Sequence, residues 1–332
     1  MTRTGPPAAR MDASLRSTLL HEHEYAQLAK LTRLRSVLSA SLPAIINNAA
    51  APVAAALQLG LLGHSTNAAN RVAVWSAIGA ATTFVTNVAN FLIVVTMARV
   101  GHALGAKKWE LLGSTVRAVL MVAVLVGCVC GLALWLGREP LLTSLSLDAA
   151  PMHAISSSYL PLALARLPPL LVLKAASAVL VGYQRVRTAS MLNLALACAD
   201  TIGFYVVLHA LDGSLVALGA TLASTCTVAA LIAVLAVLCL PPNPTVRILC
   251  CCGDANDADG GGAEGNGSSS GGVSLGSLAC DSLNVLIRST FLSGSILALM
   301  LSIAPLGAAA IGAHAVVLQL WMVTSSEIDR PC

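Results

Sequence analysis

Eight stretches of the chain are long and apolar enough to cross a lipid bilayer as helices. Such a helix needs about 20 predominantly apolar residues to span the hydrocarbon core. Most of these stretches contain no Lys, Arg, Asp or Glu. We therefore predict an all-α fold, a polytopic membrane helix bundle with about eight transmembrane helices. The predicted spans are residues 36–63, 72–98, 118–137, 154–182, 188–209, 214–240, 289–303 and 306–325.

The composition excludes a water-soluble domain. Of the 332 residues 57% are hydrophobic and only 10% are charged, which leaves too little polar surface for a soluble chain of this size. The formal net charge of +4 comes from scattered Lys and Arg, without the dense basic face that nucleic-acid binding requires. The partner implied by the composition is the lipid bilayer and not a nucleic acid.

The basic residues predict how the helices are oriented. With the N-terminus in the cytosol, the segments on the outside hold only Arg71 and Arg138. Those on the inside hold Lys30, Arg33, Arg35, Arg99, Lys107, Lys108, Arg185, Arg187 and Arg247, among others. This bias requires an even number of spans before the segment that follows residue 240, which six helices satisfy. The plasma membrane and the plastid envelope are both compatible with it.

A Gly, Ser and Asp tract divides the chain after the sixth span. It contains "GDANDADGGGAEGNGSSSGG", which cannot bury enough apolar surface to offset the entropy lost on ordering. We predict a cytosolic N-terminal segment, a six-helix N-lobe, a disordered cytosolic linker and a two-helix partial C-lobe. These four parts are residues 1–35, 36–240, 241–282 and 283–332.

Three consecutive cysteines, Cys250, Cys251 and Cys252, follow the sixth predicted span. One interpretation is reversible palmitoylation at the membrane face, and the alternative is thiols without a role. A zinc site is disfavoured because no His or Cys partner stands at ligand spacing. We expect neither a metal site nor an organic cofactor.

Two predicted spans carry charge at depth. An ionisable group at the centre of a membrane helix costs about 2.5–3.5 kcal/mol on insertion scales, so a cavity or a partner must compensate for it. Burial of Asp200 disfavours its charged form, a property that a proton-coupled site needs. The alternative is a packing lock between helices. Arg166 precedes Pro168 and Pro169, where missing backbone donors open the helix, and we predict that it lines a cavity or provides a counter-charge.

Amide side chains mark two further spans. Gln58 lies in a first span that also contains Pro43 and Pro52, a composition unlike that of a lipid-facing helix. Asn87 and Asn90 stand three residues apart, so they share one face of the second span. We predict that they line a cavity, and hydrogen bonding between helices is the alternative.

An enzyme is not favoured. The chain shows no nucleophile paired with a base, no glycine loop that would bind phosphate, and no close pair of intramembrane aspartates.

Five segments together resemble one family in order and spacing. They are "PVAAALQLGLLGHST", "ARVGHALGAKKWE", "VLVGYQRVRTAS", "MLNLALACADTIGFYVVL" and "LGAAAIGAHAVVLQLWMVTSSEID". The family is that of the multidrug and toxic compound extrusion (MATE) transporters, in particular its DinF-like branch. The resemblance implies a secondary transporter with two six-helix lobes that exports small organic, often cationic, compounds in exchange for protons or sodium.

The resemblance also implies site residues. Asp200 matches the acid of the cation-responsive N-lobe site, and Asn193 matches an amide of the same motif. Gln58 stands where the family has an acidic residue near the end of the first helix, and we assign it to the same coupling site. Leu196 replaces a second Asn of the motif, and Ala163 stands where an Arg is expected, with Arg166 one turn later.

The family pattern ends after Asp329, where the family continues through four more helices. One interpretation is a transporter whose chain is truncated after the eighth helix. The alternative is a non-transporting membrane fragment that acts by association with a second chain, which would complete the C-lobe.

Overall fold

The computed structural model describes residues 49–147, 150–241 and 275–325. The predicted N-terminal segment, most of the predicted linker and the three adjacent cysteines Cys250, Cys251 and Cys252 lie outside the described residues.

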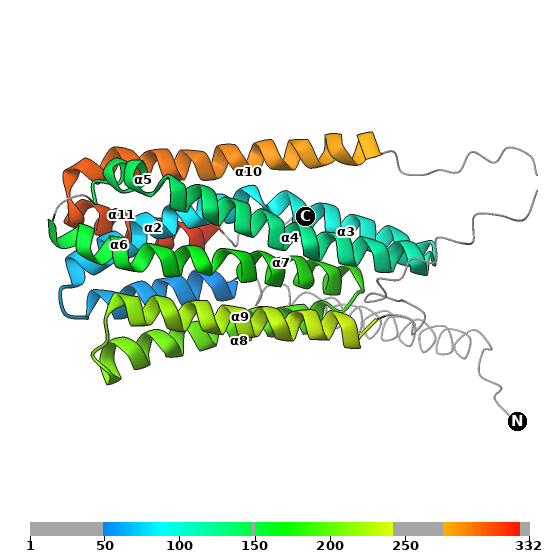
Figure 1. Ribbon diagram of the computed structural model, residues 1–332, viewed down its shortest axis with the longest axis horizontal. Coiled ribbons are helices and arrows are strands. Elements are labelled where there is room, and N and C mark those ends of the chain that lie inside the picture. The colour runs from blue at the N-terminus through cyan, green and yellow to red at the C-terminus, as the bar shows by residue number, and fades with distance from the viewer. Residues whose placement is uncertain (1–48, 148–149, 242–274, 326–332) are drawn as a thin grey trace, which may run out of the picture. The chain divides into compact units, whose positions relative to one another are not determined.

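The described residues form helices joined by short connections (Figure 1). The first described helix is Ala49–Gly63. It is followed by α2 (Ala68–Val88), α3 (Asn90–Gly105), α4 (Trp109–Leu136), α5 (Arg138–Ser144), α6 (Ala150–Ala165), α7 (Leu167–Gly182), α8 (Val186–Tyr205), the π-helical turn η1 (Val206–Ala210), α9 (Leu215–Cys239), α10 (Leu275–Ile303), the 3₁₀ turn η2 (Ala304–Leu306) and α11 (Ala308–Ser325).

Six helical segments within the described ranges are long and apolar enough to cross a membrane. They are Ala68–Gly105, Trp109–Leu136, Met152–Gly182, Val186–Ala210, Leu215–Cys239 and Leu286–Leu306. Two shorter apolar helices, Ala49–Gly63 and Ala308–Trp321, fall in the first and last predicted spans. The prediction of an all-α polytopic membrane bundle is confirmed. Large apolar side chains are exposed on its surface, including Leu125 at 62% and Phe291 at 77%, as expected of a protein solvated by lipid.

Helix α7 lies at the centre of the bundle and packs against α3, α4, α8 and α9. Its small residues Ala175, Ala176 and Ala178 are buried, which lets neighbouring backbones approach closely. The approach of α4 depends on Gly127, because a Cβ atom there would lie 2.5 Å from the Cα of Pro168. This contact fixes the position of the N-terminal end of α7.

A break between α6 and α7 places Arg166 inside the protein. Pro168 and Pro169 have no N–H groups, so they cannot donate to carbonyls at the end of α6. The helix therefore ends at Ala165 and restarts at Leu167, and Arg166 occupies the junction. Arg166 keeps a helical backbone conformation and donates its N–H to the carbonyl of Leu162, so the interruption is local and the chain continues as one span.

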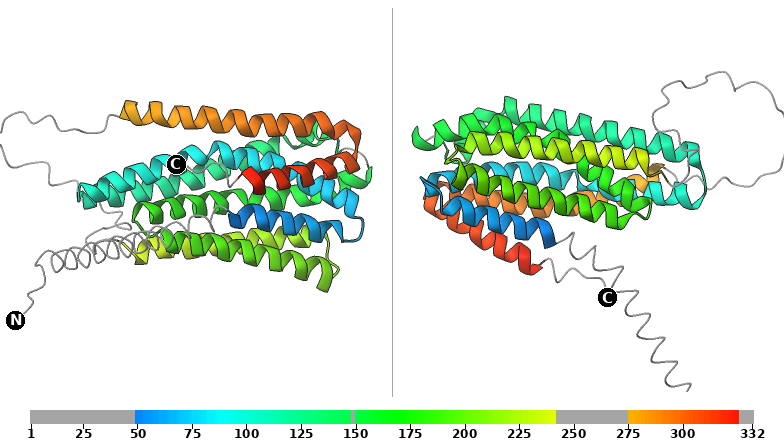
Figure 2. Two further views of the ribbon diagram at one scale, coloured as in Figure 1. Left: turned by 180° about the vertical axis from the view of Figure 1, so that it is seen from behind. Right: turned by 90° about the horizontal axis from the view of Figure 1, so that it is seen from below.

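Helices α10 and α11 both pack on α2, and α10 also contacts α3. In Figure 2 α11 lies next to the first described helix. Helix α10 begins at Leu275, within the range that we predicted as linker. The predicted span began after Arg288, but a charged residue at the edge of the membrane need not end a helix, which can continue into the aqueous phase.

Candidate functional site

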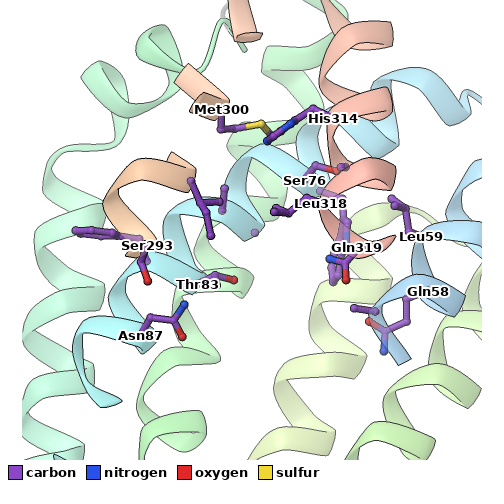
Figure 3. Close-up of a pocket in the computed structure, with 17 residues that line it drawn as sticks. Gln58, Leu59, Ser76, Thr83, Asn87, Ser293, Met300, His314, Leu318 and Gln319 are labelled. Carbon is purple, nitrogen blue, oxygen red and sulfur yellow. The ribbon is translucent and has the colours of Figure 1, made fainter. Parts of the chain in front are cut away.

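A cavity of about 200 Å³ lies among the first described helix, α2, α10 and α11 (Figure 3). Its aromatic and thioether lining comes from Trp75, Phe84 and Met300. Seven polar residues also line it, namely Gln58, Ser76, Thr83, Asn87, Ser293, His314 and Gln319. The cavity therefore combines an apolar wall with hydrogen-bonding groups contributed by four helices.

Three polar atoms in this lining have no hydrogen-bond partner in the described part of the protein. They are Ser76 Oγ on α2 and His314 Nε2 and Gln319 Oε1 on α11, and all three are buried. Leaving such a group unsatisfied costs about 1–3 kcal/mol. The cavity that these side chains line is therefore a candidate binding site.

The described residues that line the cavity include no Asp, Glu, Lys or Arg. The titratable side chain among them is His314. The binding groups are therefore amides, hydroxyls and an imidazole, and they offer no full negative charge to a cation.

A buried ion pair lies in a second polar region, among α6, α7, α8 and α9. Arg166 donates a hydrogen bond from Nη2 to Oδ2 of Asp200, whose side chain is 5% exposed. Thr225 donates from Oγ1 to the other carboxylate oxygen, Oδ1, over 2.7 Å. Both oxygens of Asp200 are therefore occupied.

Aromatic rings join the two polar regions. Trp75, which lines the cavity, meets Phe204 on α8 edge to face with ring centroids 4.9 Å apart. It also contacts Tyr159 on α6 at 5.8 Å. Phe204 follows Asp200 by one helical turn, so a displacement of Trp75 would displace a ring one turn away from the ion pair.

The structure divides the predicted site residues between these regions. Gln58 and Asn87 line the cavity, whereas Arg166 and Asp200 form the ion pair. Arg166 therefore provides a counter-charge and is not part of the cavity lining.

Asn193 and Asn90 are not among the residues that line the cavity. Asn193 lies two helical turns before Asp200 on α8, and its assignment to the coupling site stays a prediction. Asn90 begins α3 and is not among the residues that line the cavity. Among the described residues no three His, Cys, Asp or Glu side chains form a group that would hold a metal ion.

The sequence reasoning did not assign Ser76, Ser293, Gln319 or Thr225 to a site. Each is one of several polar residues in its helix, and Ser and Thr in such helices usually bond their own backbone. Of these four residues Gln319 was the easiest to predict from the sequence, because it lies on the largely apolar α11 together with His314.

Comparison with known proteins identifies the fold. The profile of the MatE family matches residues 43–207. No curated protein sequence matches the chain. Among solved structures, a mutant of a Vibrio cholerae MATE transporter superposes with a TM-score of 0.61 at 15% identity, over 89% of this chain and 65% of that one.

Two further structures give the same result. A MATE protein in the bent conformation superposes with a TM-score of 0.60 at 14% identity, over 87% of this chain and 63% of that one. An outward-facing multidrug resistance MATE family transporter of the MOP superfamily gives 0.60 at 13% identity, over 87% and 66%. The chain thus spans less than two thirds of the length of each of these three proteins. With the family profile on its first helices and this fold throughout, the chain belongs to the MATE family.

Proposed function

We propose that the protein is a secondary transporter that exports small organic solutes in exchange for a cation. The solute binds in the cavity among the first described helix, α2, α10 and α11, and the coupling cation acts at Asp200. The observation that carries this proposal is the set of unpartnered polar atoms in that cavity, Ser76 Oγ, His314 Nε2 and Gln319 Oε1.

The position of the cavity supports transport. It is bounded on one side by helices of the predicted N-lobe and on the other by α10 and α11, the helices that follow the linker. Movement of one group against the other would open it, as in transporters that rock around a central site. Solved relatives are described in both inward-facing and outward-facing conformations.

The ion pair supports a proton in preference to sodium as the coupling ion. Sodium at Asp200 would need a shell of oxygen ligands, but both carboxylate oxygens already bind Arg166 and Thr225. A proton needs no such shell: it neutralises the carboxylate and weakens its hold on Arg166, with Thr225 still able to bond the acid. In this scheme Gln58 contacts the solute and does not belong to the coupling site.

The test uses the full chain in lipid vesicles that contain an internal pH dye. Three single-ring probes of nearly equal shape, nicotinamide, nicotinate and 1-methylnicotinamide, are added outside after a proton gradient is imposed. We expect at least one probe to accelerate collapse of the gradient. Passive diffusion of nicotinamide carries no protons and does not produce this signal. Nicotinate can cross as its protonated acid, so its rate is compared with that in vesicles without protein.

The variants assign the coupling acid. Asp200→Asn should abolish the probe-dependent proton movement, whereas the matched change Asp212→Asn, at an exposed loop position, should leave it intact. Folded yield and helix content of both variants are measured first, because Asp200→Asn removes one member of a buried pair. If no probe moves protons or sodium, or if folded Asp200→Asn retains wild-type movement, the proposal is wrong.

A further inference from the structure

The size and lining of the cavity specify the class of solute that it accepts. Its volume is about 200 Å³. An apolar cavity of about 150 Å³ in another protein binds benzene, so this one accommodates a single ring with one or two small substituents. Trp75 and Phe84 provide aromatic surface for such a ring.

The charge of the lining excludes ions of either sign as preferred solutes. The described lining residues carry no carboxylate to balance a cation and no Lys or Arg to balance an anion. Asp200 does not line the cavity and already binds Arg166 and Thr225. An ion entering the cavity would lose its hydration without gaining an opposite charge.

Cation–π attraction does not compensate for this loss. Trp75 is the best ring for such a contact, but it is already packed against Phe204 and Tyr159. Its remaining surface suits the face or edge of a neutral ring.

The unpartnered atoms specify the substituents. Gln319 Oε1 accepts a hydrogen bond, and the hydroxyl of Ser76 can donate one. His314 Nε2 donates or accepts according to its tautomer. These atoms lie on α2 and α11, so a solute that satisfies them needs both a donor and an acceptor, as in a primary amide.

We propose that the cavity binds uncharged single-ring solutes that carry a hydrogen-bond donor and an acceptor, and that it prefers them to cations of the same shape. The claim that such solutes are exported rests on the proposed transport function. The claim that they bind in the cavity does not depend on it.

Binding to the purified full chain in detergent tests the inference, by titration calorimetry at constant pH with the three probes. Nicotinamide is neutral, nicotinate is an anion, and 1-methylnicotinamide is a cation of the same ring. We expect nicotinamide to bind at least tenfold more tightly than either ion. Equal or tighter binding of 1-methylnicotinamide would overturn the inference, and so would failure of all three to bind the folded protein.

Two variants locate the binding. Ser76→Ala should weaken nicotinamide binding at least threefold, while the matched Ser224→Ala, at an exposed position on α9, should not change it. Gln319→Glu adds a carboxylate of the same shape and should reverse the preference, so that 1-methylnicotinamide binds more tightly than nicotinamide. Nicotinamide binding that neither Ser76→Ala nor Gln319→Glu alters would lie elsewhere and contradict the inference.

The vesicle assay separates this inference from the proposed function. Neutral-selective binding without any coupled ion movement would support the inference and refute transport. Proton movement driven by 1-methylnicotinamide and not by nicotinamide would support transport and refute the inference.

Discussion

The cavity lined by α2 and α11 and the ion pair between Arg166 and Asp200 are both polar regions inside an apolar bundle, yet they satisfy their polar groups differently. In the ion pair each carboxylate oxygen has a donor from the protein itself. In the cavity three polar atoms have no partner in the described structure. A fully bonded carboxylate can hold helices together until its charge changes, although Arg166 Nε also has no partner among the described residues. The unpartnered atoms of the cavity gain stability from what they bind.

The largest expected effect comes from breaking the pair. Arg166→Met leaves Asp200 buried without its counter-charge, which costs about 3–5 kcal/mol in buried pairs. We expect the lower end, about 3 kcal/mol, because the Arg166 side chain is 24% exposed. Thermal or denaturant unfolding in detergent measures the loss. The double variant Arg166→Met with Asp200→Leu should recover most of it, and a double variant as unstable as the single one would show that the pair is not the cause.

Single hydroxyl groups should act in opposite directions in the two regions. Thr225→Val removes a hydrogen bond to a charged acceptor and should lower the free energy of unfolding by about 1.5–3 kcal/mol. Ser76→Ala removes a buried group that has no partner and, without ligand, should be neutral or stabilising by up to about 1 kcal/mol. Unfolding curves of the two variants compared with wild type give both values. Equal destabilisation by both changes would contradict the contrast between the regions.

Glycine substitutions should give the smallest pair of effects. At Gly127 a Cβ would lie 2.5 Å from the Pro168 backbone, so Gly127→Ala should cost about 1–3 kcal/mol through overpacking beside the Arg166 junction. At Gly79, which lines the cavity, a Cβ meets no atom within 4 Å. Gly79→Ala should stabilise helix α2 by about 0.5–1 kcal/mol. The same unfolding measurements test both changes, and destabilisation by Gly79→Ala would mean that the cavity is smaller than described.

Hydropathy predicted most of the fold because long apolar helices are stable in a lipid bilayer whatever their tertiary contacts. The predicted span 289–303 covers only the end of α10, which begins at Leu275, because hydropathy predicts the membrane-spanning part of a helix and not its full length. The sequence analysis predicted a transporter rather than an enzyme, and membership of the MATE family, whose members are transporters, confirms that the chain is not an enzyme.

The candidate site was less predictable than the fold. Arg166 and Asp200 each stood out as charges at membrane depth, but they are 34 residues apart and meet only because α7 and α8 pack together in the folded bundle. Gln58 and Asn87 share the cavity because helices far apart in sequence enclose it. Ser76 is assigned to the site because its hydroxyl has no hydrogen-bond partner among the described residues, which the sequence alone cannot show.

The measurement that tests the division of roles most directly is made on two variants in parallel, with nicotinamide binding in detergent and nicotinamide-driven proton movement in vesicles. Asp200→Asn should bind nicotinamide with wild-type affinity and move no protons, because binding and coupling lie in different regions. Ser76→Ala should bind at least threefold more weakly and retain proton movement at saturating solute. If the two variants lose binding and proton movement together, the cavity and the ion pair act as a single site, and the division proposed here is wrong.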